Sequence, residues 1–115
     1  SAITLFKINR FLDGGPITHQ SSLLLNGDIK EIFSRIEKKG LNLITRFIKD
    51  FKSKKIVYKK QNLKNKKIYK RRTPNLSFLP IDQFKKKKFL YINNLIRMLG
   101  KPYPNAFTVI KKKEY

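Results

Sequence analysis

The first third of the chain combines extended apolar stretches with a glycine-rich loop. Residues 3–8, Ile-Thr-Leu-Phe-Lys-Ile, are apolar on both faces and rich in β-branched side chains, which predicts a strand inside a covered sheet. Residues 9–16 end in Gly-Gly-Pro, which interrupts both helix and strand. A second, irregular strand is predicted over residues 17–25, and a turn follows at Asn26-Gly27.

A long amphipathic helix is predicted over residues 28–52. Its apolar side chains recur every three or four positions, at Ile29, Ile32, Phe33, Ile36, Leu43, Ile44, Phe47, Ile48 and Phe51. Asp28 is a favourable N-cap, and Glu31 three residues later completes the pattern of a capping box. Gly40 falls on the apolar face, where it costs about 1 kcal/mol relative to alanine. We expect close packing on a sheet to offset that cost.

The second half of the chain is predicted to contain a basic connector, a helix and a strand. Ten of the twenty residues from 53 to 72 are Lys or Arg, and their apolar neighbours lack helical spacing. We therefore expect an extended connector with a short strand near Ile68-Tyr69. A second helix is predicted after its N-cap Asp82, with apolar positions at Phe84, Tyr91, Ile92, Leu95, Ile96 and Leu99. Residues 107–110 begin a strand that is expected to end at Lys111-Lys112-Lys113.

Composition excludes several kinds of site. The chain has 115 residues, 28 Lys and Arg against 7 Asp and Glu, and 40% hydrophobic residues. Cysteine is absent and His19 is the single histidine, which excludes a disulfide framework, a thiolate metal site, a cysteine nucleophile and a multi-histidine metal site. The sequence has neither an apolar run of membrane-spanning length nor a signal-peptide pattern at its start, so we expect a soluble cytoplasmic protein without a membrane partner.

The formal net charge of +21 does not by itself identify a nucleic-acid partner. Lys outnumbers Arg 22 to 6, and Lys, Ile and Asn together supply 45 residues. This bias is typical of AT-rich coding, which places Lys at solvent-facing positions whatever the function. Arginine, whose planar fork suits phosphate and guanine, is scarce. We expect nucleic-acid binding to be only non-specific.

Three segments could carry chemistry. Leu12-Asp13-Gly14-Gly15-Pro16-Ile17 places an acid on a tight loop between two predicted strands, where it either orients a base or water or merely initiates a turn. Arg71 and Arg72 either grip a phosphate or belong to a solvated charge run. Residues 94–97 with 101–107 could form a further site, or only a helix stop and a rigid turn. His19 has no acid at a fixed spacing and is interpreted as an ordinary polar strand residue.

The order and spacing of these segments resemble the folate-dependent formyltransferases. That family contains methionyl-tRNA formyltransferase, glycinamide ribonucleotide transformylase and the nucleotide-sugar formyltransferases. Residues 3–8, the Leu-Asp-Gly-Gly-Pro-Ile loop and Gln20 are similar to its late strand, catalytic aspartate loop and following strand. Arg71-Arg72-Thr73-Pro74 with Ser77, and then Ile96-Arg97-Met98-Leu99 and Pro102-Tyr103-Pro104-Asn105-Ala106-Phe107, look more like the nucleotide-sugar branch.

The resemblance implies transfer of a formyl group from N10-formyltetrahydrofolate to a primary amine, with an amino sugar of a nucleotide-sugar as the implied acceptor. The family uses an Asn and a His to stabilise the oxyanion, and an Asp to assist proton removal. The implied site residues are Asp13 as the catalytic aspartate, Arg10, Phe11 and Leu12 at the pterin pocket, and Arg71 and Arg72 near the acceptor phosphates. No metal is implied. The family's Asn and His lie upstream of its Asp, in a region that this chain does not contain, and His19 is not that His.

The implied fold is α/β. Residues 1–52 would form part of a Rossmann-like formyltransferase domain, with two strands and a long helix. Residues 53–80 would form the basic connector, and 81–115 a helix and the first strand of a C-terminal β subdomain. We expect this chain alone to be an inactive fragment, because two of the three catalytic groups are absent. We also expect it to be marginally stable or to self-associate, for example as a homodimer, because two strands cannot cover the apolar face of the long helix.

Two alternatives stay open at this point. A tRNA acceptor, as in methionyl-tRNA formyltransferase, is favoured by the basic surface and disfavoured by the Arg-Arg-Thr-Pro and Pro-Tyr-Pro-Asn-Ala-Phe segments. A non-enzymatic basic nucleic-acid-binding module is disfavoured because Phe and Tyr lie mainly on apolar helix faces, and do not alternate with Lys as a stacking platform would.

Overall fold

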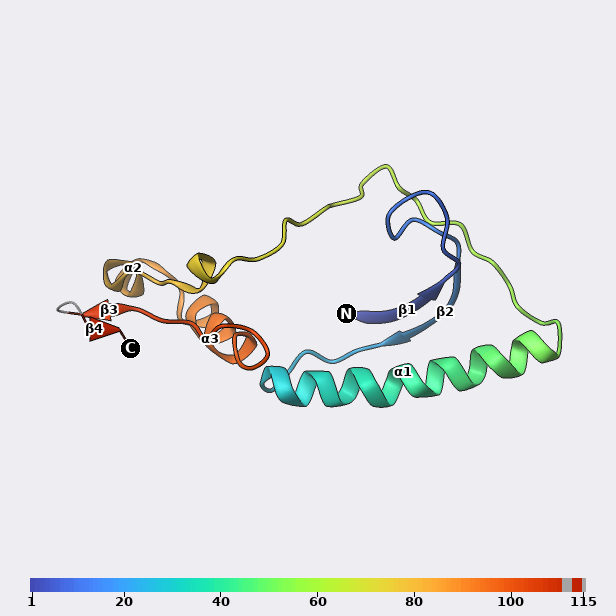
Figure 1. Ribbon diagram of the computed structural model, residues 1–115, viewed down its shortest axis with the longest axis horizontal. Coiled ribbons are helices and arrows are strands. Elements are labelled where there is room, and N and C mark those ends of the chain that lie inside the picture. The colour runs from blue at the N-terminus through green and yellow to red at the C-terminus, as the bar shows by residue number, and fades with distance from the viewer. Residues whose placement is uncertain (111–112, 115) are drawn as a thin grey trace. The chain divides into compact units, whose positions relative to one another are not determined.

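The computed structural model describes residues 1–110 and 113–114 and shows a mixed α/β protein (Figure 1). The chain divides into two compact units. The first unit contains Ser1–Asn26 and Ile32–Ile68, and the second contains Gly27–Glu31 and Tyr69–Tyr115. No helix among the described residues is both long enough and apolar enough to cross a membrane.

The first unit begins with an antiparallel hairpin. Strand β1 (Ala2–Phe6) pairs with β2 (Ile17–Ser22), and the register shifts between Leu5 and Phe6. Both strands were predicted, but β2 ends three residues before the predicted limit at residue 25. The Leu23 amide still donates to the Ser1 carbonyl at 2.8 Å, but carbonyls at and beyond the end of β2 bond to basic side chains of the long helix. Lys39 donates to the carbonyl of Ser22, and Arg35 donates to those of Leu24 and Asn26.

Helix α1 (Ile29–Lys52) confirms the predicted amphipathic helix and its capping box. The Glu31 amide donates to Asp28 Oδ1 at 2.9 Å, and the Asp28 amide donates to Glu31 Oε2 at 3.0 Å. The expectation of close packing at Gly40 is wrong. A Cβ at that position would meet nothing within 4 Å.

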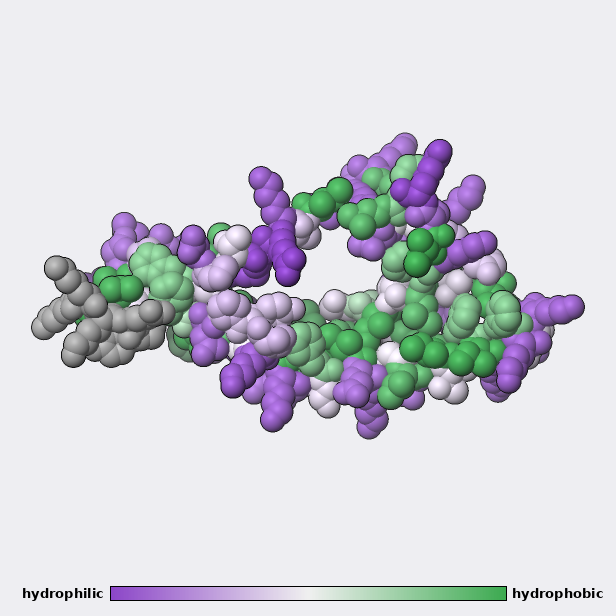
Figure 2. Space-filling model, viewed as in Figure 1, coloured by the Kyte–Doolittle hydropathy of each residue, from purple (hydrophilic) through white to green (hydrophobic). Residues whose placement is uncertain are grey.

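The core of the first unit lies where the hairpin runs along α1 (Figure 1). Leu23, Ile32 and Leu43 are buried there. Other apolar side chains of α1 stay exposed: Leu41, Ile44, Ile48 and Phe51. Figure 2 shows hydrophobic residues gathered over α1 and the hairpin. A two-stranded sheet is too narrow to cover both the helix and its own second face.

The connector after α1 is extended, as predicted, but the short strand predicted near Ile68-Tyr69 is wrong. Both side chains are exposed, and the structure gives neither residue a strand partner. The connector instead pairs earlier: the Ile17 amide donates to the Lys59 carbonyl at 2.7 Å, and the Lys59 amide donates to the Ile17 carbonyl at 2.8 Å. A segment forms a strand only where a neighbouring strand is available to pair with it. Ile17 provides that partner at Lys59, and residues 68–69 have none in the structure.

The second unit contains a short 3₁₀ helix, η1 (Pro74–Ser77), and two α-helices, α2 (Ile81–Lys86) and α3 (Phe89–Met98). A single helix capped by Asp82 was predicted, and both details are wrong. Lys87 and Lys88 are extended, which separates α2 from α3, and four consecutive lysines are poorly suited to a continuous helix because like charges three positions apart repel. The N-cap is Pro80, and the Asp82 carboxylate pairs with Lys86 at 3.8 Å.

The last described segment forms a small hairpin where a single first strand was predicted. Strand β3 (Val109–Ile110) pairs antiparallel with β4 (Lys113–Glu114). The predicted strand end at Lys111-Lys112 lies outside the described residues. Just before β3, Phe107 is held between two backbone bonds, which join it to Ser77 at 3.0 Å and to Leu79 at 2.8 Å.

Candidate active site

The aspartate loop, residues 9–16, connects β1 to β2 and carries the exposed side chain of Asp13. Asp13 has φ 49°, in the left-handed region that Asp and Asn tolerate better than most residues. Two local hydrogen bonds shape the turn. The Phe11 amide donates to Asn9 Oδ1 at 2.9 Å, and the Gly14 amide donates to the Phe11 carbonyl at 3.2 Å. The loop therefore presents a carboxylate outward from a defined backbone.

Gly15 closes the base of this loop. A Cβ placed there would lie 1.6 Å from the carbonyl oxygen of Lys7, which is backbone and cannot rotate away. The Lys7 amide donates to the Pro16 carbonyl at 2.9 Å, and this bond holds the two ends of the loop together. Glycine is thus required by the close approach of two backbone segments.

The connector braces the other side of the loop. Beyond the Lys59 pairing, the side-chain amide of Gln61 donates to the carbonyls of Asp13 at 3.1 Å and of Gly15 at 2.6 Å. The ammonium of Lys66 donates to the Leu12 carbonyl. The sequence predicted only an extended, basic connector here and gave no sign of these contacts. Nothing in their local pattern points to a loop almost fifty positions earlier.

A cavity of about 410 Å³ lies beside the aspartate loop. It is lined by Asn9, Phe11, Gly14, Pro16, Tyr58, Lys60, Gln61 and Leu63. Of the three residues predicted at a cofactor pocket, Phe11 lines this cavity. The guanidinium of Arg10 lies over the Phe11 ring, 4.9 Å from its centroid, and Leu12 is 66% exposed. All four predicted residues from Arg10 to Asp13 thus belong to one loop.

Arg71 and Arg72 belong to the second unit and are both exposed. They lie on an extended stretch just before η1, and Arg72 Nη2 donates to the carbonyl of Leu76 at 2.7 Å. Their role in binding acceptor phosphates stays a prediction.

Arg97 belongs to the segment of residues 94–97 and 101–107, and it forms hydrogen bonds within the second unit. Its Nε donates to Asn94 Oδ1 at 2.8 Å and its Nη1 donates to the Gly27 carbonyl at 2.7 Å. A cavity of about 840 Å³ is lined here by Asp28, Ile29, Lys30, Ile96, Arg97, Leu99, Gly100, Lys101, Asn105 and Ala106. Arg97 thereby ties helix α3 to the turn that precedes α1.

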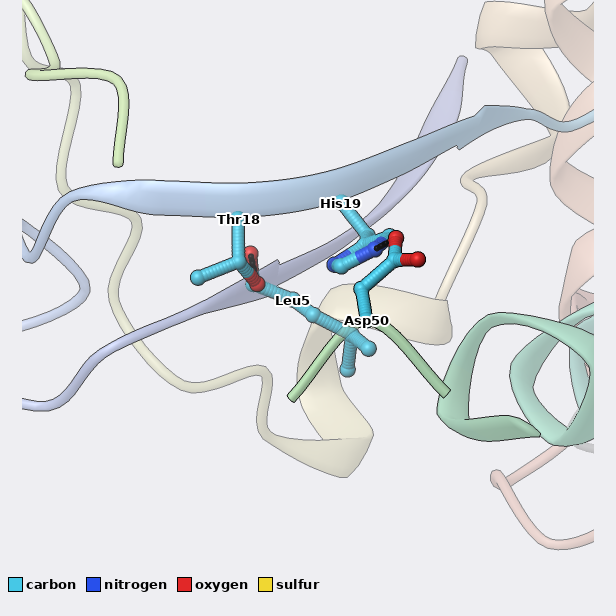
Figure 3. Close-up of polar contacts among 4 residues, drawn as sticks. All are labelled: Leu5, Thr18, His19 and Asp50. Atoms are coloured by element: carbon cyan, nitrogen blue, oxygen red, sulfur yellow. Dashed lines mark hydrogen bonds and ion pairs between the residues drawn. The ribbon is translucent and has the colours of Figure 1, made fainter. Parts of the chain in front are cut away.

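His19 has an acid partner that the sequence spacing did not reveal. Its Nε2 lies 2.9 Å from Asp50 Oδ2, and its side chain is only 7% exposed. Figure 3 shows the ring on β2 and the carboxylate on α1 pointing toward each other, while Thr18 bonds to the Leu5 carbonyl. Phe47 packs edge-on against the ring at 5.9 Å between centroids. The pair ties the hairpin to α1 over 31 positions of sequence.

The described residues offer no cluster of three or more His, Cys, Asp and Glu side chains suited to a metal ion. The aspartate loop offers the Asp13 carboxylate, hydrogen-bonded backbone groups and a neighbouring cavity. Such a set can take up a proton or orient a water beside a small molecule.

Neither a protein-family profile nor a curated protein matches this sequence. Solved structures do match, and two of them are formyltransferases. Methionyl-tRNA formyltransferase from Clostridium thermocellum is 30% identical, with a TM-score of 0.77 over 99% of this chain and 47% of that chain. A 4-N formyltransferase from Francisella tularensis is 18% identical, with a TM-score of 0.78 over 96% of this chain and 47% of that chain.

The chain thus spans about half the length of each of these two proteins. The likeness covers both units and nearly every residue, and the 30% identity extends it from fold to sequence. The predicted resemblance to the formyltransferases is confirmed, as is the α/β class of a partial Rossmann-like formyltransferase domain.

Proposed function

We propose that this formyltransferase-like chain supplies the catalytic aspartate of an enzyme that transfers the formyl group of N10-formyltetrahydrofolate to a primary amine. The observation that carries the proposal is the constrained presentation of Asp13. Its side chain is exposed, while the backbone around it is fixed by the close approach of Gly15 to the Lys7 carbonyl and by two hydrogen bonds from Gln61. The similarity to two formyltransferases supports the same reaction class.

Asp13 is suited to manage a proton. A primary amine that becomes an amide must lose a proton, and a carboxylate within hydrogen-bond reach can accept it or orient a water that does so. The side chain of Asp13 is exposed, so an incoming amine can reach it. The carboxylate is therefore accessible to the amine, and because its backbone is already held in place, little conformational entropy is lost when the amine binds.

The cavity beside the loop fits part of a folate. Its volume of about 410 Å³ is within the range of small-molecule sites, Phe11 and Tyr58 offer aromatic faces, and Asn9 offers an amide group. When bound, N10-formyltetrahydrofolate supplies the activated formyl group. Phe11 would contact the flat ring, and Arg10 and Leu12 would contribute the adjoining backbone.

For the acceptor we propose an amino sugar carried on a nucleotide. Arg71 and Arg72 are exposed, and adjacent guanidinium groups suit the phosphates of a nucleotide. A tRNA acceptor is the second candidate, supported by the 30% identical methionyl-tRNA formyltransferase and by the net charge of +21.

The two acceptors are distinguished by direct assay of the complete enzyme, in which this chain is joined to the Asn- and His-bearing half. The enzyme is incubated with N10-formyltetrahydrofolate and either an amino-sugar nucleotide or methionyl-tRNA, and formylated product is measured by mass spectrometry. We expect formylation of the amino-sugar nucleotide. Formylation of methionyl-tRNA alone would establish the second candidate, and formylation of neither acceptor would contradict the proposal.

A further inference from the structure

The side chain of Gln61 reaches the aspartate loop from the connector. Its Nε2 donates to the Asp13 carbonyl at 3.1 Å and to the Gly15 carbonyl at 2.6 Å. A side-chain amide nitrogen carries two N–H groups, so one glutamine can satisfy both carbonyls at once. These carbonyls belong to the residues on either side of Gly14, and the two bonds therefore hold the turn from within.

The loop needs such a brace because of its backbone conformation. Asp13 occupies the left-handed region, which an L-residue adopts only when its surroundings favour it. If the Gln61 bonds were lost, the Asp13 carbonyl could turn to water and φ could return to negative values. Such a turn would re-aim the carboxylate, although the residue itself is unchanged.

Gln61 is itself held in register. Two positions earlier, Lys59 exchanges backbone hydrogen bonds with Ile17 at 2.7 and 2.8 Å. Two positions later, Leu63 lies against the loop at Gly14. The connector is thus anchored on both sides of Gln61, and this fixed backbone places the side-chain amide of Gln61 against the loop. Gln61 is also half-buried, so water competes less for its bonds.

We propose that Gln61 is a positioning residue that acts on the reaction through Asp13. This inference rests on the proposed function and deepens it, because it adds a residue from the connector to the site. The amide orients the backbone that aims the carboxylate, and it makes no contact with the amine. Its removal should therefore lower kcat and leave the KM of the acceptor nearly unchanged.

The test is a double-mutant cycle in the complete enzyme, with Gln61→Leu, Asp13→Asn and the double variant. We expect Gln61→Leu to lower kcat about tenfold or more, and to have almost no further effect when Asp13 is already Asn. Gln61→Glu has the same shape but cannot donate to the carbonyls, so it should lose kcat as Gln61→Leu does while keeping the fold. The matched control is Gln20→Leu, since Gln20 is exposed and its amide donates to Thr4 Oγ1 at 2.9 Å, away from the loop.

A second readout does not depend on activity. Hydrogen exchange of the Gly14 amide, which bonds to the Phe11 carbonyl, should accelerate in Gln61→Leu and Gln61→Glu and stay unchanged in Gln20→Leu.

The outcomes separate the inference from the proposed function. If Asp13→Asn leaves kcat intact, the proposed function fails. If Asp13→Asn lowers kcat but the Gln61 variants do not, or if their losses simply multiply with that of Asp13→Asn, only the role of Gln61 is overturned. Unchanged exchange at Gly14 would overturn it as well.

Discussion

The aspartate loop and the arginine segment, residues 69–73, both carry charged side chains at the surface, but they are held differently. The loop is braced by Gln61, which lies 48 positions from Asp13 in sequence. The arginine segment has a local bond, from Arg72 to the carbonyl of Leu76 four positions later. One charged group is therefore placed by the tertiary fold, and the other chiefly by its own neighbours.

This difference corresponds to two different chemical tasks. A group that manages a proton must be in place before the transition state, because a small misplacement costs rate. Arginines that bind phosphate can adapt to the ligand, because a long side chain reaches an anion from several directions. We therefore expect variants of the loop to change kcat and variants of the arginine segment to change KM.

The largest expected effect is that of Asp13→Asn in the complete enzyme. Asn keeps the size and tolerates the same left-handed backbone, but it cannot accept the proton. Because general acid–base groups contribute about 10²–10⁴-fold, kcat should fall by at least about 10²-fold with little change in KM. Steady-state kinetics with matched thermal melts measure this effect. A turn-initiating role alone predicts nearly normal kcat, since Asn favours such turns as well.

Gly15→Ala tests whether the loop is held by its backbone. The new methyl would lie 1.6 Å from the Lys7 carbonyl oxygen, so the end of β1 and the loop must move apart. We expect a loss of about 3 kcal/mol in the free energy of unfolding, at the upper end of overpacking effects. Chemical denaturation of the chain measures it. A stability equal to that of the parent chain would show that the loop is not closed by this contact.

Arg71→Gln and Arg72→Gln test the other region. If these guanidiniums bind acceptor phosphates, each variant should raise the acceptor KM about tenfold, because a lost charge-assisted hydrogen bond costs about 1.5–3 kcal/mol. The value of kcat should change little. Lys54→Gln, on the same basic connector but far from these residues in sequence, is the control. An unchanged acceptor KM in both arginine variants would show that Arg71 and Arg72 do not bind the acceptor and belong to a solvated run of charges.

The smallest expected effect contrasts a second glycine with Gly15. A Cβ at Gly40 would meet nothing within 4 Å, so Gly40→Ala should raise the free energy of unfolding by about 1 kcal/mol through helix propensity alone. Thermal melts of Gly40→Ala and Gly15→Ala, compared side by side, should shift in opposite directions. A lower melting temperature for Gly40→Ala would indicate that another chain or copy packs against this position.

Several features of fold and site were predictable because they depend on near neighbours. The capping box of Asp28 and Glu31, the 3.6-residue period of α1 and the position of the aspartate loop all follow from residues a few positions apart. The break between α2 and α3 was missed, although four adjacent lysines were a local warning of it.

The sequence by itself determined helix α1, strands β1 and β2, the loop that carries Asp13 and the resemblance to formyltransferases, since each depends on local spacing or on ordered short motifs. The tertiary structure alone decided that Gln61 reaches the loop, that His19 meets Asp50, and that the connector pairs at Lys59 rather than near Ile68. These contacts join residues about thirty to fifty positions apart. The physical reason is that such a contact forms only when the rest of the fold brings the two distant segments together, and the local sequence around either residue carries no information about that.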